Sequence, residues 1–331
     1  MLERSYHIPI PSGEDDDKSV KIVITEFMGS LGLKRLEQSA QVIYDPELWQ
    51  RDHFPEEYKN ASALIVRNKT LVSDELLNQF MHVKVIGRLG VGLDNIDLFA
   101  AKKRGIAVVV AKNANAVAVA EYVFAAMLTT CRQLQNATQH VCNGGWDRLA
   151  YGGTELFGKV LGLIGAGEIA KRIAYRAHAF GMRVIAYDPY LTSYDFLVDD
   201  LHLRLVDLET VCKESHFISI HVPLTRQTTH LMGMQEFTKM RSDAVLINTS
   251  RGGVVKETDL YRALELKMIG GAVLDVFEQE PPTSIPELNN LIITPHVAGL
   301  TEEAQVRTSD IVSGEILHVL AGGKSMCTVS D

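Results

Sequence analysis

The sequence predicts an α/β protein with two doubly wound parallel sheets, one of them built from two separate parts of the chain. Short apolar runs rich in Val, Ile and Leu alternate with helical stretches from Val20 to about Thr294. A glycine-rich turn follows one of these runs in the middle of the chain, at Gly165. The final helical stretch, about 301–320, has no strands of its own and must therefore pack on a sheet formed earlier.

The first series of strands is expected before residue 113. Its apolar runs are 20–24, 41–44, 63–66, 83–86 and 107–111, with a helix near 29–38. Strands that alternate with helical stretches indicate βαβ units and a parallel sheet, and the final helical stretch is expected to pack back on this sheet. We therefore expect residues 19–113 and 297–331 to form one discontinuous domain.

The second series is expected within residues 114–296, as a complete second domain. It opens with the longest predicted helix, a single one over about 115–143, because no Gly or Pro interrupts its apolar spacing. The strands that follow are expected at 160–164, 183–187, 217–221, 244–247, 271–274 and 291–294.

Residues 1–18 stand apart from both domains. They contain Pro9, Pro11 and the acidic run 14–17, and show no apolar periodicity. Such a segment has little to bury, so we expect it to be disordered or an expression tag.

The composition limits the classes of partner. The 331 residues are 46% hydrophobic and 22% charged, with a formal net charge of −8, which argues against nucleic-acid binding. No apolar run reaches the roughly 18 residues of a membrane span, and no signal-peptide pattern opens the chain, so a cytoplasmic protein is expected. The four cysteines, Cys131, Cys142, Cys212 and Cys327, lack metal-ligand spacing and are expected to be reduced structural thiols, without a metal site.

The turn at Gly165 has the features of a dinucleotide-binding fingerprint. A buried strand leads into Gly165-x-Gly167-x-x-Ala170, and Asp188 ends the next strand. The first glycine permits a tight turn, the second lets backbone N–H groups approach a pyrophosphate, and the small Ala170 lets the helix pack closely on the strand. A Rossmann-like site for a dinucleotide is therefore predicted in the second domain.

A second glycine-rich turn, Gly90-Val91-Gly92, follows a strand of the first domain. The N–H groups of Val91 and Gly92 are candidates for a small nest that binds a carboxylate. The alternative is an ordinary turn between a strand and a helix.

Three polar segments each end a predicted strand of the second domain. One carries Arg251, the next carries Glu280, and the last carries His296. Arg can grip a carboxylate, His titrates nearest to neutral pH, and a neighbouring Glu stabilises the protonated imidazole. Spacing alone leaves non-catalytic alternatives open: a surface ion pair for Arg251, a proline-turn cap for Glu280, and a capping or surface role for His296.

The ordered motifs resemble those of the D-isomer-specific 2-hydroxyacid dehydrogenase family. The resemblance runs from about Val20 to the C-terminus and rests on the segments 90–97, 160–170, 248–253, 275–281 and 294–296, together with Asp188. It implies two Rossmann-like domains, a discontinuous substrate domain and an inserted NAD-binding domain. It also implies an oxidoreductase that interconverts a D-2-hydroxyacid and its 2-keto acid with NAD, working as a homodimer.

The resemblance also implies roles for individual residues. His296 would be the acid/base, Glu280 its charged partner, and Arg251 the ligand of the substrate's carboxylate and carbonyl. The expected cofactor-binding residues are Gly165, Gly167, Glu168, Ile169, Asp188, Thr249, Ser250, Asp275 and Gly299, with Asp275 on the nicotinamide amide. Glu168 departs from the family, which often has a basic residue there. Asp188 has no Arg beside it to meet a 2′-phosphate, so NAD is favoured over NADP.

The substrate itself stays open. The branch most similar is that of phosphoglycerate dehydrogenase, which commonly has Arg-Ser-x-Thr where this chain has 67–70, Arg-Asn-Lys-Thr. Arg67, Val91, Gly92 and Arg251 are the expected substrate ligands. Phosphoglycerate, glycerate or glyoxylate, and a sulfonated acid all remain candidates, and Lys69 is either a second anion ligand or simply solvated.

Two other functions are compatible with parts of this pattern. An NAD-sensing corepressor-like binding protein of the same fold would keep the Arg, Glu and His. A formate dehydrogenase relative would normally carry Gln in place of Glu280, which argues against it.

Overall fold

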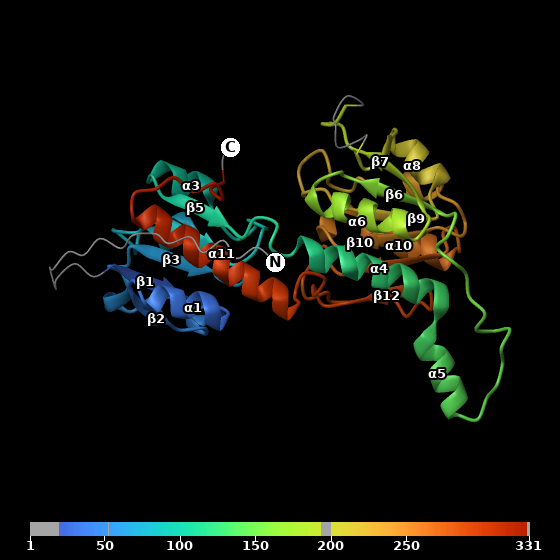
Figure 1. Ribbon diagram of the computed structural model, residues 1–331, viewed down its shortest axis with the longest axis horizontal. Coiled ribbons are helices and arrows are strands. Elements are labelled where there is room, and N and C mark those ends of the chain that lie inside the picture. The colour runs from blue at the N-terminus through green and yellow to red at the C-terminus, as the bar shows by residue number, and fades with distance from the viewer. Residues whose placement is uncertain (1–19, 52, 193–199, 330–331) are drawn as a thin grey trace. The chain divides into compact units, whose positions relative to one another are not determined.

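The computed structural model describes residues 20–51, 53–192 and 200–329. The predicted disordered or tag segment, 1–18, lies outside the described residues. Internal contacts divide the chain into two units, Ala116–Leu300 and a discontinuous unit that ends at Asn115 and resumes at Thr301 (Figure 1). No helix in the described ranges is long and apolar enough to cross a membrane.

The discontinuous unit contains a five-stranded parallel sheet with the order β2-β1-β3-β4-β5. Its strands are β1 Lys21–Ile24, β2 Gln41–Tyr44, β3 Ala63–Val66, β4 Val85–Arg88 and β5 Ala107–Val110. Its helices are α1 Ser30–Glu37, α2 Asp74–Leu77, α3 Leu98–Lys103 and α11 Glu302–Leu320, with single 3₁₀ turns at Leu48–Gln50 and Glu56–Tyr58.

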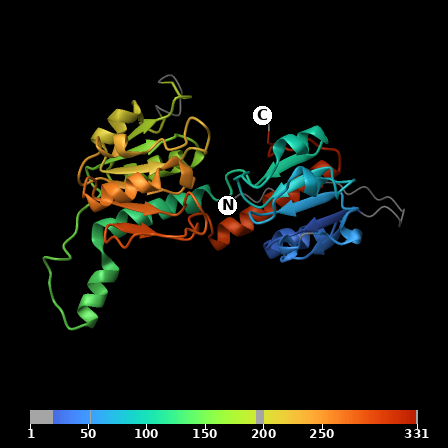
Figure 2. The same cartoon turned by 180° about the vertical axis from the view of Figure 1, so that it is seen from behind.

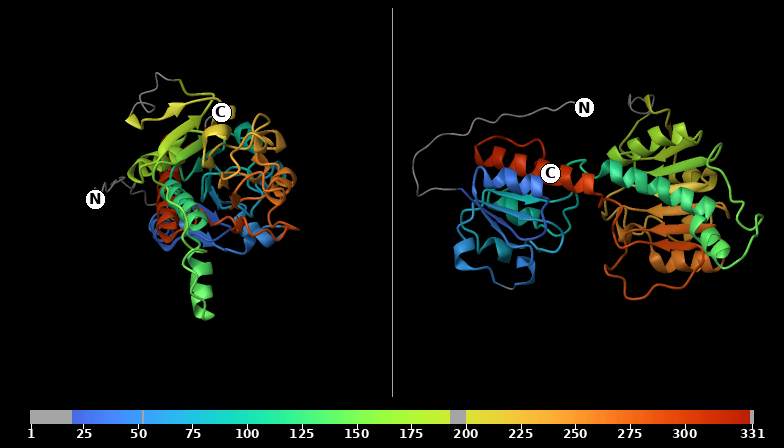
Figure 3. Two further views of the ribbon diagram at one scale, coloured as in Figure 1. Left: turned by 90° about the vertical axis from the view of Figure 1, so that its right-hand side faces the viewer. Right: turned by 60° about the horizontal axis from the view of Figure 1, so that its bottom comes forward.

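Helix α11 returns to this sheet, as the lack of strands after it predicted. It lies beside α1 on one face of the sheet, while α2 and α3 contribute to the core on the other face (Figure 3). The close contact depends on Gly32, because a Cβ there would lie 2.5 Å from the carbonyl oxygen of Ser309. A helix with its apolar face toward a sheet is held mainly by that burial.

The second unit contains a seven-stranded parallel sheet with the order β12-β11-β10-β9-β6-β7-β8. Its strands are β6 Val160–Ile164, β7 Arg183–Tyr187, β8 Arg204–Leu205, β9 Phe217–Ile220, β10 Val245–Asn248, β11 Gly271–Leu274 and β12 Leu291–Ile293. Its helices are α4 Ala116–Arg132, α5 Leu134–Cys142, α6 Glu168–Ala179, α8 Leu208–Glu214, α9 Met234–Phe237 and α10 Glu257–Glu265, with a 3₁₀ turn at Gly252–Val254.

Helices cover both faces of this sheet. α4 and α6 pack together over one face, and α8, α9 and α10 cover the other. The strands are buried on both faces, which explains why they read as continuous apolar runs. The predicted fold class is confirmed for both units.

The prediction of one helix over about 115–143 is wrong. Gln133 has a left-handed backbone, with φ of 42°, and separates α4 from α5. α4 buries much of its surface against α6, whereas none of the α5 residues is buried. α5 projects from its own unit (Figure 2), so no packed core maintains the helix direction beyond Arg132. The longest helix is α11, which has 19 residues against 17 in α4.

Candidate active site

The three polar segments begin at the same edge of the second sheet. Asn248 pairs with Leu274 across β10 and β11, and Leu274 pairs with Ile293 across β11 and β12. The strands are parallel, so Thr249, Asp275 and Thr294 follow them at one level. This is the edge at which open α/β sheets bind ligands.

His296 and Glu280 form a direct pair at this edge. Their Nδ1 and Oε2 atoms are 2.8 Å apart, and both side chains are partly exposed, at 51% and 40%. The other Glu280 oxygen, Oε1, accepts a hydrogen bond from the Phe277 backbone N–H at 3.2 Å. Glu280 therefore both caps its own turn and orients the imidazole, which leaves Nε2 as the ring nitrogen for other chemistry.

Asp275 holds the loop that carries His296. It is fully buried, and its Oδ1 accepts bonds from the Thr294 hydroxyl at 2.6 Å and the Val297 N–H at 2.8 Å. Its Oδ2 accepts a 2.8 Å bond from the Ala298 N–H. His296 itself has a left-handed backbone, with φ of 56°. The charge-assisted bonds on both sides of His296 stabilise this unusual conformation.

Tyr122 extends this network from α4. Its hydroxyl lies 2.5 Å from the Thr294 hydroxyl oxygen. Thr294 gives its only hydroxyl hydrogen to Asp275, so Tyr122 must be the donor in this pair. Burial raises the pKa of Tyr122, so its hydroxyl keeps that hydrogen.

The Arg251 loop is held by Asn248, which is fully buried. The Asn248 Oδ1 accepts from the Ser250 N–H at 3.0 Å and from the Ser250 hydroxyl at 2.8 Å, and its amide group donates to the Arg251 carbonyl at 2.9 Å. The half-buried Arg251 guanidinium donates to the Ser250 carbonyl at 2.7 Å. Thr249, between them, has a buried hydroxyl without a hydrogen-bond partner in the described structure.

The glycine-rich turn has the geometry of the predicted fingerprint. Gly165 has φ of 88°, and a Cβ there would lie 2.6 Å from the His221 carbonyl oxygen. A Cβ at Gly167 would meet nothing within 4 Å, and Gly167 caps α6 without a side-chain hydrogen bond. The first turn of α6 includes Glu168 and the partly buried Ile169, and the N–H groups of a first helical turn have no acceptor within the helix.

Asp188 braces this turn from the end of β7. Its Oδ2 accepts from the Ala166 N–H at 2.9 Å, and its Oδ1 accepts from the Tyr190 N–H at 3.0 Å. On the other side of β6, His221 follows β9 and contacts the Ser219 hydroxyl at 2.8 Å. Burial lowers the pKa of His221 to about 3, so this histidine is uncharged at neutral pH.

The charge of Glu168 is compensated within its own helix. Its carboxylate pairs with Arg172 at 2.7 Å and Lys171 at 3.1 Å, and these bonds hold its pKa below the usual value. An acid in the first turn also interacts favourably with the helix dipole. Glu168, which departs from the family pattern, is therefore accompanied by two cationic side chains on the same helix.

The remaining predicted site residues lie in the discontinuous unit, with one exception. Arg67 follows β3 and the Gly90–Gly92 turn follows β4, so both lie at the carboxyl edge of that sheet. The N–H groups of Val91 and Gly92 take part in no hydrogen bond within the described residues. Gly299 is in the other unit, in a turn closed by a bond from the Leu300 N–H to the Val297 carbonyl.

Sequence reasoning did not anticipate the residues that support the site. Asn248 ends a strand, and a polar residue at that point is a signal that could have been read. Tyr122 lies within an apolar helix, 172 residues from Thr294, and nothing local distinguishes it. Asp275 was expected on the cofactor alone, yet it accepts three bonds from the histidine loop.

These features fit a dinucleotide. The uncapped α6 terminus can receive a pyrophosphate, and the Asp188 carboxylate can receive ribose hydroxyls. The Thr249 hydroxyl on the same edge is buried and has no partner in the described structure. With an imidazole and a guanidinium on that edge, the fold and site define the class of nucleotide-dependent oxidoreductases.

Comparison with known proteins identifies the family. Residues 124–298 match the "D-isomer specific 2-hydroxyacid dehydrogenase, NAD binding domain", so this unit is an NAD-binding domain and the chain belongs to that family. The chain is 41% identical to a D-3-phosphoglycerate dehydrogenase of Methanocaldococcus jannaschii over 92% of its length. It is 39% identical to an (S)-sulfolactate dehydrogenase of Chromohalobacter salexigens, covering 90% of this chain and 98% of the relative.

Solved structures show the same architecture. The D-lactate dehydrogenase of Aquifex aeolicus, complexed with NAD and lactic acid, is similar with a TM-score of 0.78 and 28% identity, over 91% of this chain and 96% of the other. The chain spans only 58% of the Methanocaldococcus protein, slightly more than half of its length.

Proposed function

We propose that this protein is an NAD-dependent dehydrogenase that interconverts a D-2-hydroxyacid and its 2-keto acid. The observation that carries the proposal is the His296–Glu280 pair. A histidine paired with a carboxylate, on the sheet edge that also carries the dinucleotide fingerprint, supports an acid/base role for His296. The relatives described above are all named as dehydrogenases, so a purely NAD-sensing binding role is not favoured.

A nicotinamide dinucleotide held at the fingerprint would supply the hydride that the keto carbon accepts. The protonated His296 donates its proton from Nε2 to the substrate oxygen, and the 2.8 Å contact with Glu280 stabilises the imidazolium before transfer. Arg251 binds the substrate carboxylate and polarises the carbonyl. In the reverse direction, the neutral imidazole accepts the hydroxyl proton.

The cofactor assignments follow the positions of the strand ends. We propose that Gly165, Gly167, Glu168 and Ile169 bind the pyrophosphate through backbone N–H groups. Asp188 would bind the ribose, and Thr249, Ser250 and Gly299 would line the cofactor. The Asp275 Oδ2 accepts one bond from protein, so it retains capacity to accept another from the nicotinamide amide.

The decisive experiment is a screen of NADH oxidation with several 2-keto acids: pyruvate, glyoxylate, hydroxypyruvate and its phosphorylated and sulfonated analogues. We expect turnover with at least one, and His296→Asn should reduce kcat about 10²- to 10⁴-fold while NADH binding, measured by fluorescence, is retained. Near-normal turnover of the variant would refute the role of His296. Absence of turnover by the wild-type protein with every acid would refute the proposed activity.

We also propose that NADH is preferred over NADPH. The Asp188 carboxylate can accept two ribose hydroxyls and would repel a 2′-phosphate. The comparison of kcat/KM for the two cofactors tests this directly, and equal values would contradict it.

Arg67, Val91, Gly92 and Arg251 are the proposed substrate ligands. Arg67 is half-buried, and burial lowers its pKa while the nearby Glu26 charge raises it. Lys69 is exposed, with its Nζ 4.2 Å from the Trp49 ring centroid. The phosphoglycerate and sulfolactate relatives both act on acids that bear a second anionic group, and these two cations suit such a substrate.

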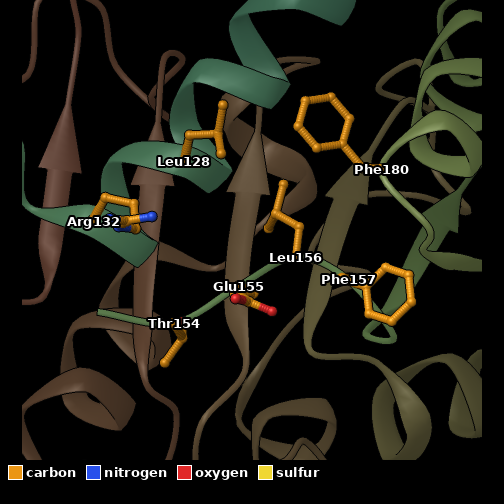
Figure 4. Close-up of a pocket in the computed structure, with 7 residues that line it drawn as sticks. All are labelled: Leu128, Arg132, Thr154, Glu155, Leu156, Phe157 and Phe180. Carbon is orange, nitrogen blue, oxygen red and sulfur yellow. The ribbon is translucent and has the colours of Figure 1, made fainter. Parts of the chain in front are cut away.

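A cytoplasmic homodimer is proposed as the working state. Large apolar side chains are exposed along and after α5, among them Leu134, Trp146 and Leu149. Leu128, Leu156, Phe157 and Phe180 line a cavity of about 260 Å³ near the end of α4 (Figure 4). Light scattering tests the dimer, and a monomeric mass at micromolar concentration would contradict it. Cell fractionation tests the location, and membrane association of the protein would contradict it.

A further inference from the structure

Glu26 is a buried carboxylate with no part in the chemistry described above. It follows β1 in the discontinuous unit, and its residue is 3% exposed. A buried charge is costly unless hydrogen bonds compensate for the lost water. The hydrogen-bond donors that compensate for burial of Glu26 therefore indicate its structural role.

Four consecutive backbone N–H groups point at this carboxylate. Oε1 accepts from Arg67 and Thr70, both at 2.9 Å, and Oε2 accepts from Asn68 at 3.1 Å and Lys69 at 3.0 Å. Burial would raise the pKa of Glu26, yet the bonds from Thr70, Lys69 and Arg67 outweigh it and hold the pKa below the usual value. Glu26 is therefore charged at neutral pH, with all its acceptor positions occupied.

The same loop is tied down at its carbonyl groups. The Asn95 side-chain amide donates to the Arg67 carbonyl at 3.3 Å and the Thr70 carbonyl at 2.7 Å. The Thr70 hydroxyl oxygen lies 2.7 Å from that of Thr25. The backbone of 67–70 thus has its donors and two of its carbonyl groups occupied by protein.

Convergent N–H groups of this kind form a nest that ordinarily binds an anion. Here the protein's own carboxylate fills the nest, so the backbone of 67–70 has no free donor for a ligand. Any anion that binds this loop must be met by side chains. The two cationic ones are Arg67, whose guanidinium lies 6.0 Å from the Phe27 ring centroid, and Lys69 beside Trp49.

We propose that Glu26 is a positioning residue for substrate specificity, which fixes the 67–70 backbone so that Arg67 and Lys69 bind a second anionic group of the substrate. This inference rests on the proposed dehydrogenase function. It assigns the substrate class as 2-hydroxyacids that carry a phosphate or sulfonate group in addition to the carboxylate.

The test is Glu26→Gln in the full chain, measured in two ways. The variant's side-chain amide places its own N–H₂ group against two backbone donors, so the bonds at one former carboxylate oxygen are lost. Hydrogen exchange of the 67–70 amides should become at least about tenfold faster. KM for the phosphorylated or sulfonated keto acid should rise about tenfold more than KM for glyoxylate, which has no second anion.

Ser73→Ala is the matched control. Ser73 accepts a 3.2 Å bond from the Leu76 N–H in the same unit, so its loss removes a side-chain acceptor without touching the 67–70 nest. The control should lower the melting temperature and leave the ratio of the two KM values unchanged. A Glu26→Gln variant that loses stability in the same way, with an unchanged KM ratio, would overturn the specificity role.

The two proposals fail separately. Unchanged exchange of the 67–70 amides in Glu26→Gln would overturn the positioning role whether or not the enzyme is active. If none of the keto acids supports NADH oxidation by the wild-type protein, the dehydrogenase function is overturned, and the substrate class with it. Faster amide exchange in Glu26→Gln would still support the role of Glu26 in fixing the loop.

Discussion

At the scale of single residues, the site depends on carboxylates that perform different tasks. Glu280 is partly exposed and touches the imidazole, Asp275 is fully buried and holds the loop backbone, and Glu26 holds a loop in the other unit. Each accepts backbone N–H bonds, which fix its orientation. The chemical role follows from what the remaining lone pairs can reach.

Glu280→Gln tests the pairing with His296. Keto-acid reduction needs the protonated imidazole, and the neutral amide no longer stabilises it. kcat/KM for keto-acid reduction should therefore fall about tenfold, while NADH binding is retained. An unchanged kcat/KM would show that Glu280 only caps its own turn.

The lowered pKa of Glu26 predicts that the free energy of unfolding depends on pH. The pKa of Glu26 in the folded protein lies below its ordinary value of 4.5. Its stabilising contribution is therefore fully present above pH 4.5 and is lost as the pH falls through the lower folded-state pKa. The difference in unfolding free energy between wild type and Glu26→Gln, measured in urea, should shrink as the pH is lowered below 4.5. A difference that grows toward acid would have the wrong sign.

At the scale of elements, α4 helps to position the loop that carries His296. Through Tyr122 it joins Thr294 and Asp275 in one chain of hydrogen bonds. Thr294 is fixed from both sides, and the loop after β12 begins there. The orientation of the histidine loop therefore depends on how α4 packs over the sheet.

Tyr122→Phe removes the first donor of this chain. We expect a loss of about 1 kcal/mol in unfolding free energy, because the ring still packs while the Thr294 oxygen loses a partner. kcat should fall more than the affinity for NADH changes, since the loop that carries His296 loosens. Phe124→Leu, a packing change on the same helix, serves as the control, and equal kinetic effects in both variants would contradict a specific role for the hydroxyl.

Elements were predicted well where apolar runs are continuous and less well at their ends. The strand expected at 83–86 lies at Val85–Arg88. The expected bounds are displaced because Gly and Arg are not typical strand residues, so the pattern did not include positions 87 and 88. Gly87 is required there: a Cβ would lie 2.7 Å from the Val312 Cγ1 of α11. The two-residue strand β8 is too short to show a periodic pattern.

At the scale of the whole molecule, each unit has its own two-sided core. The apolar clusters on the two faces of the seven-stranded sheet come entirely from Ala116–Leu300. Those of the five-stranded sheet come from the residues before Asn115 and after Thr301. The continuous unit therefore has what an independent domain requires.

A fragment spanning 116–300 should fold on its own. It contains the fingerprint, Asp188 and all three strand-end segments, so it should unfold cooperatively and retain NADH binding. It lacks Arg67, Val91 and Gly92, and we expect it to show no keto-acid-dependent oxidation of NADH. A fragment that shows no cooperative transition in circular dichroism would contradict the independence of this unit.

The sequence by itself determined the α/β class, the strands of both sheets and the dinucleotide fingerprint, because these depend on local periodicity and on glycines at fixed spacing. It also indicated which residues are candidates for chemistry, since Arg251, Glu280 and His296 each follow a strand. The tertiary structure alone decided which groups, distant in the sequence, hold the loops in place. Glu26 meets a loop more than 40 residues away, and Tyr122 meets Thr294 across 172. Such pairs have no local signal, since burying either group alone is costly and the compensating hydrogen bonds form only when folding brings the two partners together.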